Sequence, residues 1–241
     1  MIYVIGTGPG NKEHMTIQAL EALKKCDTVV GYKTYVNLVR DLIDGKDIIE
    51  NGMRQERDRC IEALRLSSEG KTVALVSGGD SGVYGMAGLI HELNSKEKDK
   101  QEIQIVPGVT SSIAAASVLG APLMHDFCHI SLSDLMTPWS LIEKRLKLAS
   151  QADFVIAIYN PRSKGRSEHL KRAFEIMSEF KNEDTPVGIV KNAGRENEES
   201  YVLKFKDMDF EICDMSTMVI VGNKESYIDG NTIITPRGYN I

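Results

Sequence analysis

Short hydrophobic runs alternate with amphipathic stretches along the first half of the chain. Segments with helical periodicity, such as TIQALEALKKC and RDRCIEALRLSSEG, lie between the runs. Strands that alternate with helices predict a mostly parallel sheet covered on both faces. Four β-branched runs have the length of buried strands: residues 2–5, 28–31, 72–76 and 103–106.

The second half of the chain has more predicted strands for each helix. Long helical patterns occur there only near residues 138–150 and 165–181. Fewer helices than strands indicate a mixed sheet with antiparallel pairs. We therefore predict an α/β fold of two α/β lobes, residues 1–122 and 123–241, with a mostly parallel sheet in the first. The predicted strands of the second lobe are 127–133, 153–159, 186–191, 200–205, 217–222 and 232–235.

Length and composition are typical of a soluble globular protein. The 241 residues are 42% hydrophobic and 26% charged, which is enough apolar material for a sizeable core. No run approaches the roughly 18 apolar residues that a membrane span needs. The chain begins on a predicted strand without an export-signal pattern, so we expect a cytoplasmic protein with no membrane partner.

Charge and cysteine usage argue against two further classes. The net charge is −5 with acids and bases interspersed, so we expect no nucleic-acid partner, and a polyanionic ligand would need a local basic group. The cysteines are far apart and form no C-x-x-C pair, which indicates reduced thiols and no metal site. They are Cys26, Cys60, Cys128 and Cys213.

Two glycine-rich loops follow predicted strands. GTGPGN at 6–11 departs from a dinucleotide fingerprint, because Asn11 occupies the third glycine position and Pro9 removes a backbone donor. GKT at 70–72 is no P-loop either, because Arg65 stands where that motif begins with glycine. Glycine permits close approach of a backbone to a ligand. The first loop and VSGGDSGVYG at 76–85 are therefore either tight turns or walls of a site for a planar or cationic ligand without phosphate.

Taken together, the loops resemble those of the tetrapyrrole methyltransferases. The similar segments are VIGTGPGN followed by MTIQALEAL, then VSGGDSGVYG, then VPGVTSSIAAASVLGAPL, in the family's order and spacing. HDFCHISLSDLMTPW and DFVIAIYNPRSKGR resemble the branch that methylates carbon 17 of a cobalamin precursor and contracts its macrocycle. Ser81 replaces the proline of many members. Lys33 stands where siroheme-type members carry an aspartate implicated in proton removal, so that role is not transferred to Lys33.

The resemblance implies a cofactor and a set of contacts. The cofactor would be S-adenosyl-L-methionine, with S-adenosyl-L-homocysteine as product, bound largely by main chain in a cleft between the lobes. A homodimer is also implied, and two-fold dimers are the common case. The implied cofactor-binding residues are Pro9, Gly78, Gly79, Asp80, Val83, Thr110, Ser111, Asn160, Ala193 and Thr217.

The implied substrate is a tetrapyrrole fringed with carboxylates, which arginine binds through paired hydrogen bonds. A basic loop can also be a solvated surface, and a strand with one polar face needs no catalytic role. Asp80 and His129 are the candidate catalytic proton acceptors, although a histidine is more often a hydrogen-bonded structural residue. The predicted substrate contacts are Ser131, Ser133, Asp134, Arg162, Lys164, Arg166 and Arg195.

We therefore predict a methyltransferase that uses S-adenosyl-L-methionine to methylate carbon 17 of cobalt-factor III or precorrin-3B, with ring contraction and no metal of its own. The sequence leaves the choice between the cobalt-loaded and the metal-free substrate open. Three alternatives share the fold: action on another corrin position, action on rRNA or a protein, and a non-catalytic cofactor-binding subunit. The acidic net charge argues against RNA.

Overall fold

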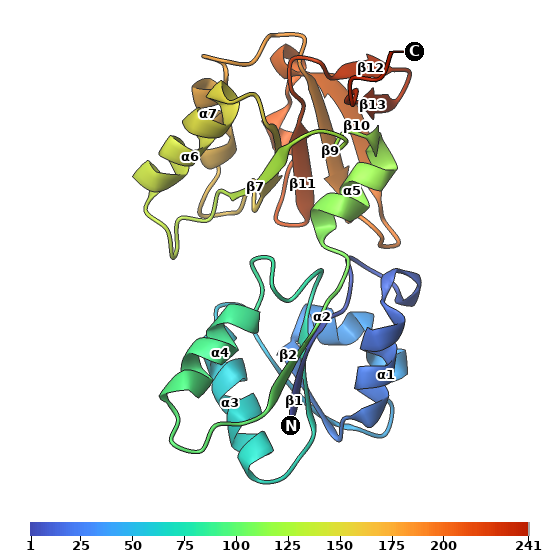
Figure 1. The fold of residues 1–241 in the computed structure, drawn as a ribbon, viewed down its shortest axis with the longest axis vertical. Coiled ribbons are helices and arrows are strands. Elements are labelled where there is room, and N and C mark those ends of the chain that lie inside the picture. Colours follow the sequence, from blue (N-terminus) through green and yellow to red (C-terminus); the bar gives the residue numbers. More distant parts are fainter. Residues whose placement is uncertain (241) are drawn as a thin grey trace. The chain divides into compact units, whose positions relative to one another are not determined.

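The computed structural model describes residues 1–240, which form two compact units. Unit 1 is Met1–Ser111 and unit 2 begins at Ser112, so the division falls earlier than the 122/123 boundary expected from the sequence. The division falls earlier because helix α5 (Ser111–Leu119) packs against the sheet of unit 2. A β-carbon at Gly188 of that sheet would lie 2.3 Å from the Leu119 side chain. Figure 1 shows the elements of both units.

Unit 1 contains a five-stranded parallel sheet in the order β3-β2-β4-β1-β5. The four strands predicted from β-branched runs are present. The additional edge strand, β3, has the sequence DIIEN and is only half buried, so it lacks their continuous apolar character. The strands are β1 (Ile2–Gly6), β2 (Thr28–Tyr32), β3 (Asp47–Asn51), β4 (Val73–Ser77) and β5 (Ile103–Val106).

Helices cover both faces of this sheet. On one face, Leu23 of α1 packs with Ile5 of β1; on the other, Ile90 of α4 packs with Val4. Neighbouring residues of β1 thus face opposite cores, as the two-residue period of a strand requires. The Thr16 hydroxyl accepts a hydrogen bond from the Ala19 N–H (3.0 Å) and caps α1. The helices are α1 (Ile17–Lys25), α2 (Lys33–Leu38), α3 (Glu56–Ser68) and α4 (Ala87–Lys96), with 3₁₀ turns at Lys12–His14 and Arg40–Leu42.

Unit 2 contains a mixed five-stranded sheet in the order β10-β9-β11-β8-β7, which confirms the predicted sheet type. Its one parallel pair is β7 with β8, and the remaining neighbours are antiparallel. A smaller sheet joins β12, β13 and β6. The strands are β6 (Gly120–Ala121), β7 (Phe127–Ser131), β8 (Val155–Tyr159), β9 (Pro186–Lys191), β10 (Glu199–Lys204), β11 (Thr217–Val221), β12 (Tyr227–Asp229) and β13 (Thr232–Ile234).

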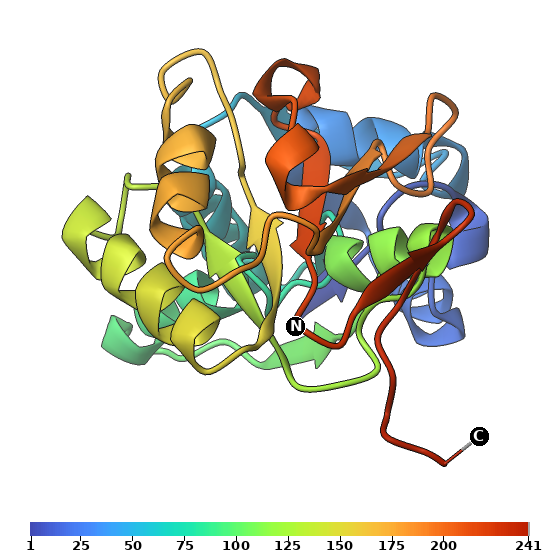
Figure 2. The same cartoon turned by 90° about the horizontal axis from the view of Figure 1, so that it is seen from above.

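Helices α6 (Trp139–Gln151) and α7 (His169–Met177) lie on one face of the mixed sheet and α5 on the other, as Figure 2 shows. Helix α7 is shorter than the predicted 165–181, because residues 163–166 form a tight turn closed by the Ser163–Arg166 backbone pair. Short 3₁₀ turns lie at Phe205–Asp207 and Phe210–Ile212. Within residues 1–240, no helix has the length and apolar character needed to cross a bilayer.

Candidate functional site

Two glycine-rich loops of unit 1 are joined by their main chains. They follow β1 and β4, which are neighbours in the parallel sheet, so both leave the same edge. The Gly8 N–H donates to the Gly79 carbonyl (3.0 Å), and the Gly79 N–H donates to the Gly8 carbonyl (2.7 Å). Gly8 and Gly79 have left-handed φ angles of 74° and 67°, which glycine adopts without strain. The two loops therefore form one short antiparallel bridge beyond the sheet.

The loop after β5 packs so closely against this bridge that the backbones of Gly108, Gly79 and Gly6 are in contact. A β-carbon at Gly108 would lie 2.2 Å from the Gly79 carbonyl oxygen and 2.7 Å from the Gly6 carbonyl carbon. A β-carbon at Gly6 would lie 2.7 Å from the Gly108 nitrogen. These glycines therefore permit three backbones to meet. Gly108 lies within the VPGVT motif, and the sequence alone indicated no role for it.

Asp80 connects two of these loops through its carboxylate. One oxygen accepts from the Gly82 N–H (2.8 Å) and the other from the Gly108 N–H (2.9 Å). Ser81, beside it, is fully buried and donates to the Val4 carbonyl (3.4 Å). The main chain thus fixes the orientation of the Asp80 carboxylate.

The structure brings the predicted cofactor residues of unit 1 together on these three loops. Gly78 packs against α2, since a β-carbon there would lie 2.5 Å from the Tyr35 ring. Tyr35 is a neighbour of this site that no sequence signal indicated. The residues on the three loops are Pro9, Gly78, Gly79, Asp80, Val83 and Thr110, and Ser111 follows as the first residue of α5.

In unit 2, the remaining predicted cofactor residues lie along one edge of the mixed sheet. Strands β7, β8 and β9 end at this edge, and β11 begins there. Asn160 follows β8 with a left-handed φ of 52°, and its side-chain amide donates to the Ser131 hydroxyl (2.9 Å). Ala193 follows β9 by two residues and is buried. Thr217 begins β11, and its hydroxyl donates to the Asp214 carboxylate (3.0 Å).

His129 lies on β7 within a hydrogen-bonded cluster. Its Nε2 lies 2.8 Å from the Ser112 hydroxyl, and its ring meets the Tyr159 ring edge-on at 5.2 Å. The Ser112 N–H in turn donates to the Tyr159 hydroxyl (3.3 Å). Burial lowers the pKa of His129 below its usual 6.5 and favours the neutral ring. The cluster attaches the first turn of α5 to the sheet, and Ser112 was not predicted from the sequence.

His129→Gln is expected to make stability less sensitive to acid. The folded pKa is lowered, so the contribution of neutral His129 is fully present above the unfolded pKa of 6.5 and is lost as the pH falls through the folded pKa. Urea midpoints of wild type and variant, measured from about pH 8 to about pH 5, should therefore converge as the pH falls. A stability difference that is independent of pH would contradict this assignment.

Arg166 and Ser133 meet beside the end of β7. Arg166 is 9% exposed, and its Nη1 donates to the Ser133 hydroxyl (3.2 Å). Its Nε is buried and has no hydrogen-bond partner in residues 1–240. Asp134, which follows Ser133, accepts from His169 Nε2 (3.1 Å), and this contact lowers the pKa of the Asp134 carboxyl.

The other predicted basic contacts have different surroundings. The Arg162 side chain is paired with other residues of unit 2. Its Nη2 lies 2.7 Å from a Glu211 carboxylate oxygen, and its Nη1 donates to the Phe210 carbonyl (3.2 Å). Lys164 is exposed on the tight turn. Arg195 lies on the turn after β9, where its backbone N–H donates to the Asn192 carbonyl (2.9 Å). Arg166 and Arg162 therefore share a loop but no partner.

Burial raises the pKa of the Cys128 thiol to about 11, and all four cysteines are unpaired. Within residues 1–240, no group of three histidine, cysteine or acidic side chains is placed to hold a metal ion.

The architecture is that of a two-unit α/β methyltransferase. A solved structure described as the methyltransferase CobJ superimposes with a TM-score of 0.92 at 36% identity, covering 98% of this chain and 99% of the other. A family model described as Tetrapyrrole (Corrin/Porphyrin) Methylases matches residues 1–209. The chain belongs to the tetrapyrrole methylase family, as the loop motifs predict, and is a methyltransferase.

Relatives of known name match over nearly the whole length. A probable cobalt-factor III C(17)-methyltransferase from Salmonella typhimurium is 56% identical over 241 residues, covering all of both chains. A precorrin-3B C(17)-methyltransferase from Sinorhizobium sp is 41% identical over 246 residues, covering 99% of this chain and 96% of the relative.

Proposed function

We propose that this protein transfers the methyl group of S-adenosyl-L-methionine to carbon 17 of cobalt-factor III, with contraction of the macrocycle. The observation that carries the proposal is the full-length identity of 56% to a relative of that name. The corresponding identity to the precorrin-3B enzyme is 41%, which favours the cobalt-loaded substrate over the metal-free one. A cytoplasmic homodimer that binds neither nucleic acid nor membrane completes the proposal.

The three joined loops of unit 1 support the choice of cofactor. They place glycine backbone at the carboxyl edge of a parallel sheet, where α/β folds bind ligands. They lack the features of a pyrophosphate site and carry an acidic side chain, Asp80, which suits a cationic sulfonium. The main chain of these loops would hold the cofactor. The assigned residues of unit 1 are Pro9, Gly78, Gly79, Asp80, Val83, Thr110 and Ser111, and those of unit 2 are Asn160, Ala193 and Thr217.

The chain's own task in this reaction is positioning. The bound cofactor supplies an electrophilic methyl group, whose S–C bond breaks as the new C–C bond forms. Loops held rigidly by the Gly8–Gly79 bridge and by Asp80 would fix the donor against the accepting carbon, and alignment of this kind is a large part of catalysis in displacement reactions. Asp80 and His129 remain the candidate proton acceptors. The lowered pKa of His129 keeps its ring able to accept a proton near neutral pH.

The surroundings of Arg166 support a substrate rich in carboxylates. A nearly buried guanidinium with an unpartnered Nε–H can donate to a further oxygen, and it already donates to Ser133. Arg162 contributes less in this proposal, because Glu211 neutralises it. Ser131, Asp134, Lys164 and Arg195 complete the proposed substrate contacts.

Arg166→Ala is expected to raise the KM for the tetrapyrrole by about 10-fold or more, because a charge-assisted hydrogen bond is lost. The Kd of the Arg166→Ala variant for S-adenosyl-L-homocysteine should stay within about two-fold of wild type. Arg162→Ala should have the smaller effect on KM, and Arg145→Ala on the exposed face of α6 serves as control. Calorimetry, steady-state rates and melting curves separate binding from folding. Equal effects of the Arg166 and Arg145 substitutions would contradict the assignment.

Labelled methyl transfer tests the function itself. The protein is offered cobalt-factor III and precorrin-3B, each with and without exclusion of oxygen, and ring contraction is followed by mass and absorbance. If neither tetrapyrrole is methylated while S-adenosyl-L-homocysteine still binds, the proposed substrate is wrong and the cofactor assignment stands. Competition by rRNA for the cofactor-loaded protein would support the RNA alternative.

A further inference from the structure

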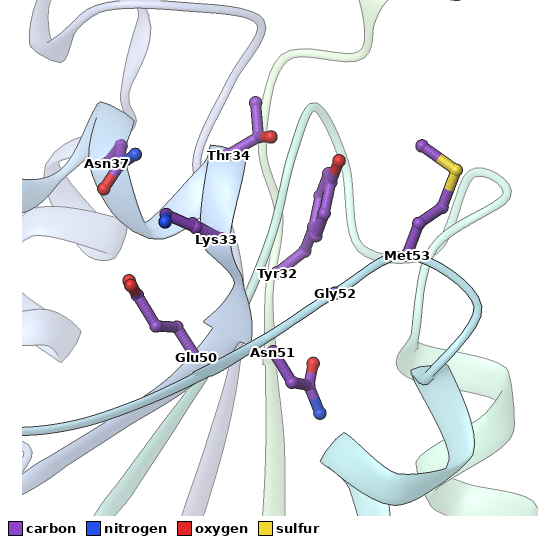
Figure 3. Close-up of a pocket in the computed structure, with 8 residues that line it drawn as sticks. All are labelled: Tyr32, Lys33, Thr34, Asn37, Glu50, Asn51, Gly52 and Met53. Atoms are coloured by element: carbon purple, nitrogen blue, oxygen red, sulfur yellow. The ribbon is translucent and has the colours of Figure 1, made fainter.

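Unit 1 contains a pocket at the edge of the sheet that bears the glycine loops. Its volume is about 510 Å³, and it lies where β2 and β3 end, beside the first turns of α2. Figure 3 shows the side chains that surround it. Neither the sequence motifs nor the predicted contacts use this pocket. Its lining residues are Tyr32, Lys33, Thr34, Asn37, Glu50, Asn51, Gly52 and Met53.

Arg59 of α3 contacts three residues of the pocket lining. Its side chain is 4% exposed, and Nη1 donates to the Asn51 side-chain oxygen (2.6 Å) and to the Gly52 carbonyl (2.9 Å). The guanidinium also lies 5.9 Å from the centre of the Tyr32 ring. Arg59 Nε is buried and has no hydrogen-bond partner in the described part of the chain. A buried arginine that orients three lining residues makes this pocket a built feature.

The lining presents mainly hydrogen-bond donors. The side-chain oxygen of Asn51 accepts from Arg59, and that of Asn37 accepts from Arg40 at 3.5 Å, whereas the NH₂ groups of both amides donate to no residue within 1–240. Glu50 is the acidic lining residue, and Arg40 pairs with it at 3.2 Å. The Lys33 ammonium group has no ion pair or hydrogen bond within residues 1–240. The pocket therefore offers one uncompensated ammonium group among neutral donors, which suits a single carboxylate.

A chain of packed rings connects the pocket to the proposed cofactor loops. The Tyr32 ring on the pocket wall meets the Tyr35 ring edge-on, with centroids 5.3 Å apart. Tyr35 in turn covers Gly78, where a β-carbon would lie 2.5 Å from the ring. A large substrate held near these loops would thus lie within reach of the pocket through its peripheral arms.

We propose that this pocket binds one carboxylate-bearing arm of the tetrapyrrole substrate, with Lys33 as the charged partner and Arg59 as the residue that positions the wall. The inference rests on the proposed function, because it takes the carboxylate-fringed macrocycle as substrate. It assigns to Lys33 a binding role and no part in proton transfer.

The test compares Lys33→Met, which keeps the length of the side chain, with Lys33→Arg, which keeps the charge. Lys100→Met, at an exposed position before β5, is the matched control. Each protein, loaded with S-adenosyl-L-homocysteine, is titrated with uroporphyrin as a carboxylate-fringed probe and with its uncharged methyl ester. Steady-state methylation of cobalt-factor III is measured in parallel.

Lys33→Met is expected to weaken uroporphyrin binding about 10- to 100-fold and to raise KM similarly, with kcat and the Kd for S-adenosyl-L-homocysteine nearly unchanged. Lys33→Arg should restore most of the affinity, and the methyl ester should show no dependence on Lys33. If wild type methylates cobalt-factor III but Lys33→Met alters neither KM nor probe affinity, the pocket assignment is wrong and the function stands. If probe binding depends on Lys33 although no methylation occurs, the pocket assignment stands and the substrate is another carboxylated tetrapyrrole. Wild-type protein that does not bind uroporphyrin would overturn the inference.

Discussion

Gly108→Ala is expected to weaken binding of S-adenosyl-L-methionine by at least about 10-fold, because it forces apart the three loops proposed to hold the cofactor. The added methyl group would lie 2.2 Å from the Gly79 carbonyl oxygen and 2.7 Å from the Gly6 carbonyl carbon. Both neighbours are backbone atoms, so no side-chain rotation relieves the contact. Overpacking of this kind costs about 1–3 kcal/mol in stability as well.

Gly88→Ala is the matched control for this experiment. Gly88 lies in α4, and a β-carbon there meets no atom within 4 Å. Replacing an exposed helical glycine by alanine should stabilise the protein by about 0.5–1 kcal/mol and leave cofactor binding unchanged. Calorimetric titration and thermal melting report both effects. If Gly108→Ala binds the cofactor as tightly as Gly88→Ala does, the loops are not the binding site.

Arg59→Ala is expected to lower the free energy of unfolding by about 2–4 kcal/mol, because it leaves a cavity and removes donors from Asn51 and Gly52. The ion pair with Glu56, at 3.3 Å, contributes little, since Glu56 is 52% exposed. The loss therefore arises mainly from packing and from the two acceptors on the pocket wall.

Urea unfolding checks this value, with Arg57→Ala on the same helix as control. Arg57 is exposed, so its removal should change stability by no more than about 0.5 kcal/mol. Arg59→Lys should fall between them, since an ammonium lacks the guanidinium's fork of donors. An Arg59→Ala protein as stable as the Arg57 variant would show that the buried guanidinium does not hold the wall.

Most of the fold could be predicted because buried parallel strands are continuous apolar runs. The exception in unit 1 is β3, whose Asp47 and Glu50 interrupt the pattern at a half-exposed edge. The assignment of α5 to unit 2 depends on a contact between Leu119 and the distant Gly188, and no local pattern contains that information.

The candidate site likewise contains residues that the sequence indicates and residues that it does not. Glycines after strands signal loops at a sheet edge, so the loops proposed to hold the cofactor could be predicted from the sequence. Tyr35, Arg59 and Ser112 were not, because their importance comes from partners elsewhere in the chain: the Gly78 backbone, the β3 end and the His129 ring. Arg162 shows the converse, since a basic residue in a basic loop is neutralised by Glu211, which lies far away in the sequence.

The Gly8–Gly79 bridge also affects how a ligand would bind. Two reciprocal main-chain hydrogen bonds hold the two loops to each other through contacts within the protein, so we expect the loops to be ordered before a ligand binds. Binding to such a preorganised surface loses little conformational entropy, so a small number of backbone contacts can give substantial affinity. Exchange of these two glycines for residues with side chains would remove that advantage, whatever hydrogen bonds the new side chains offered.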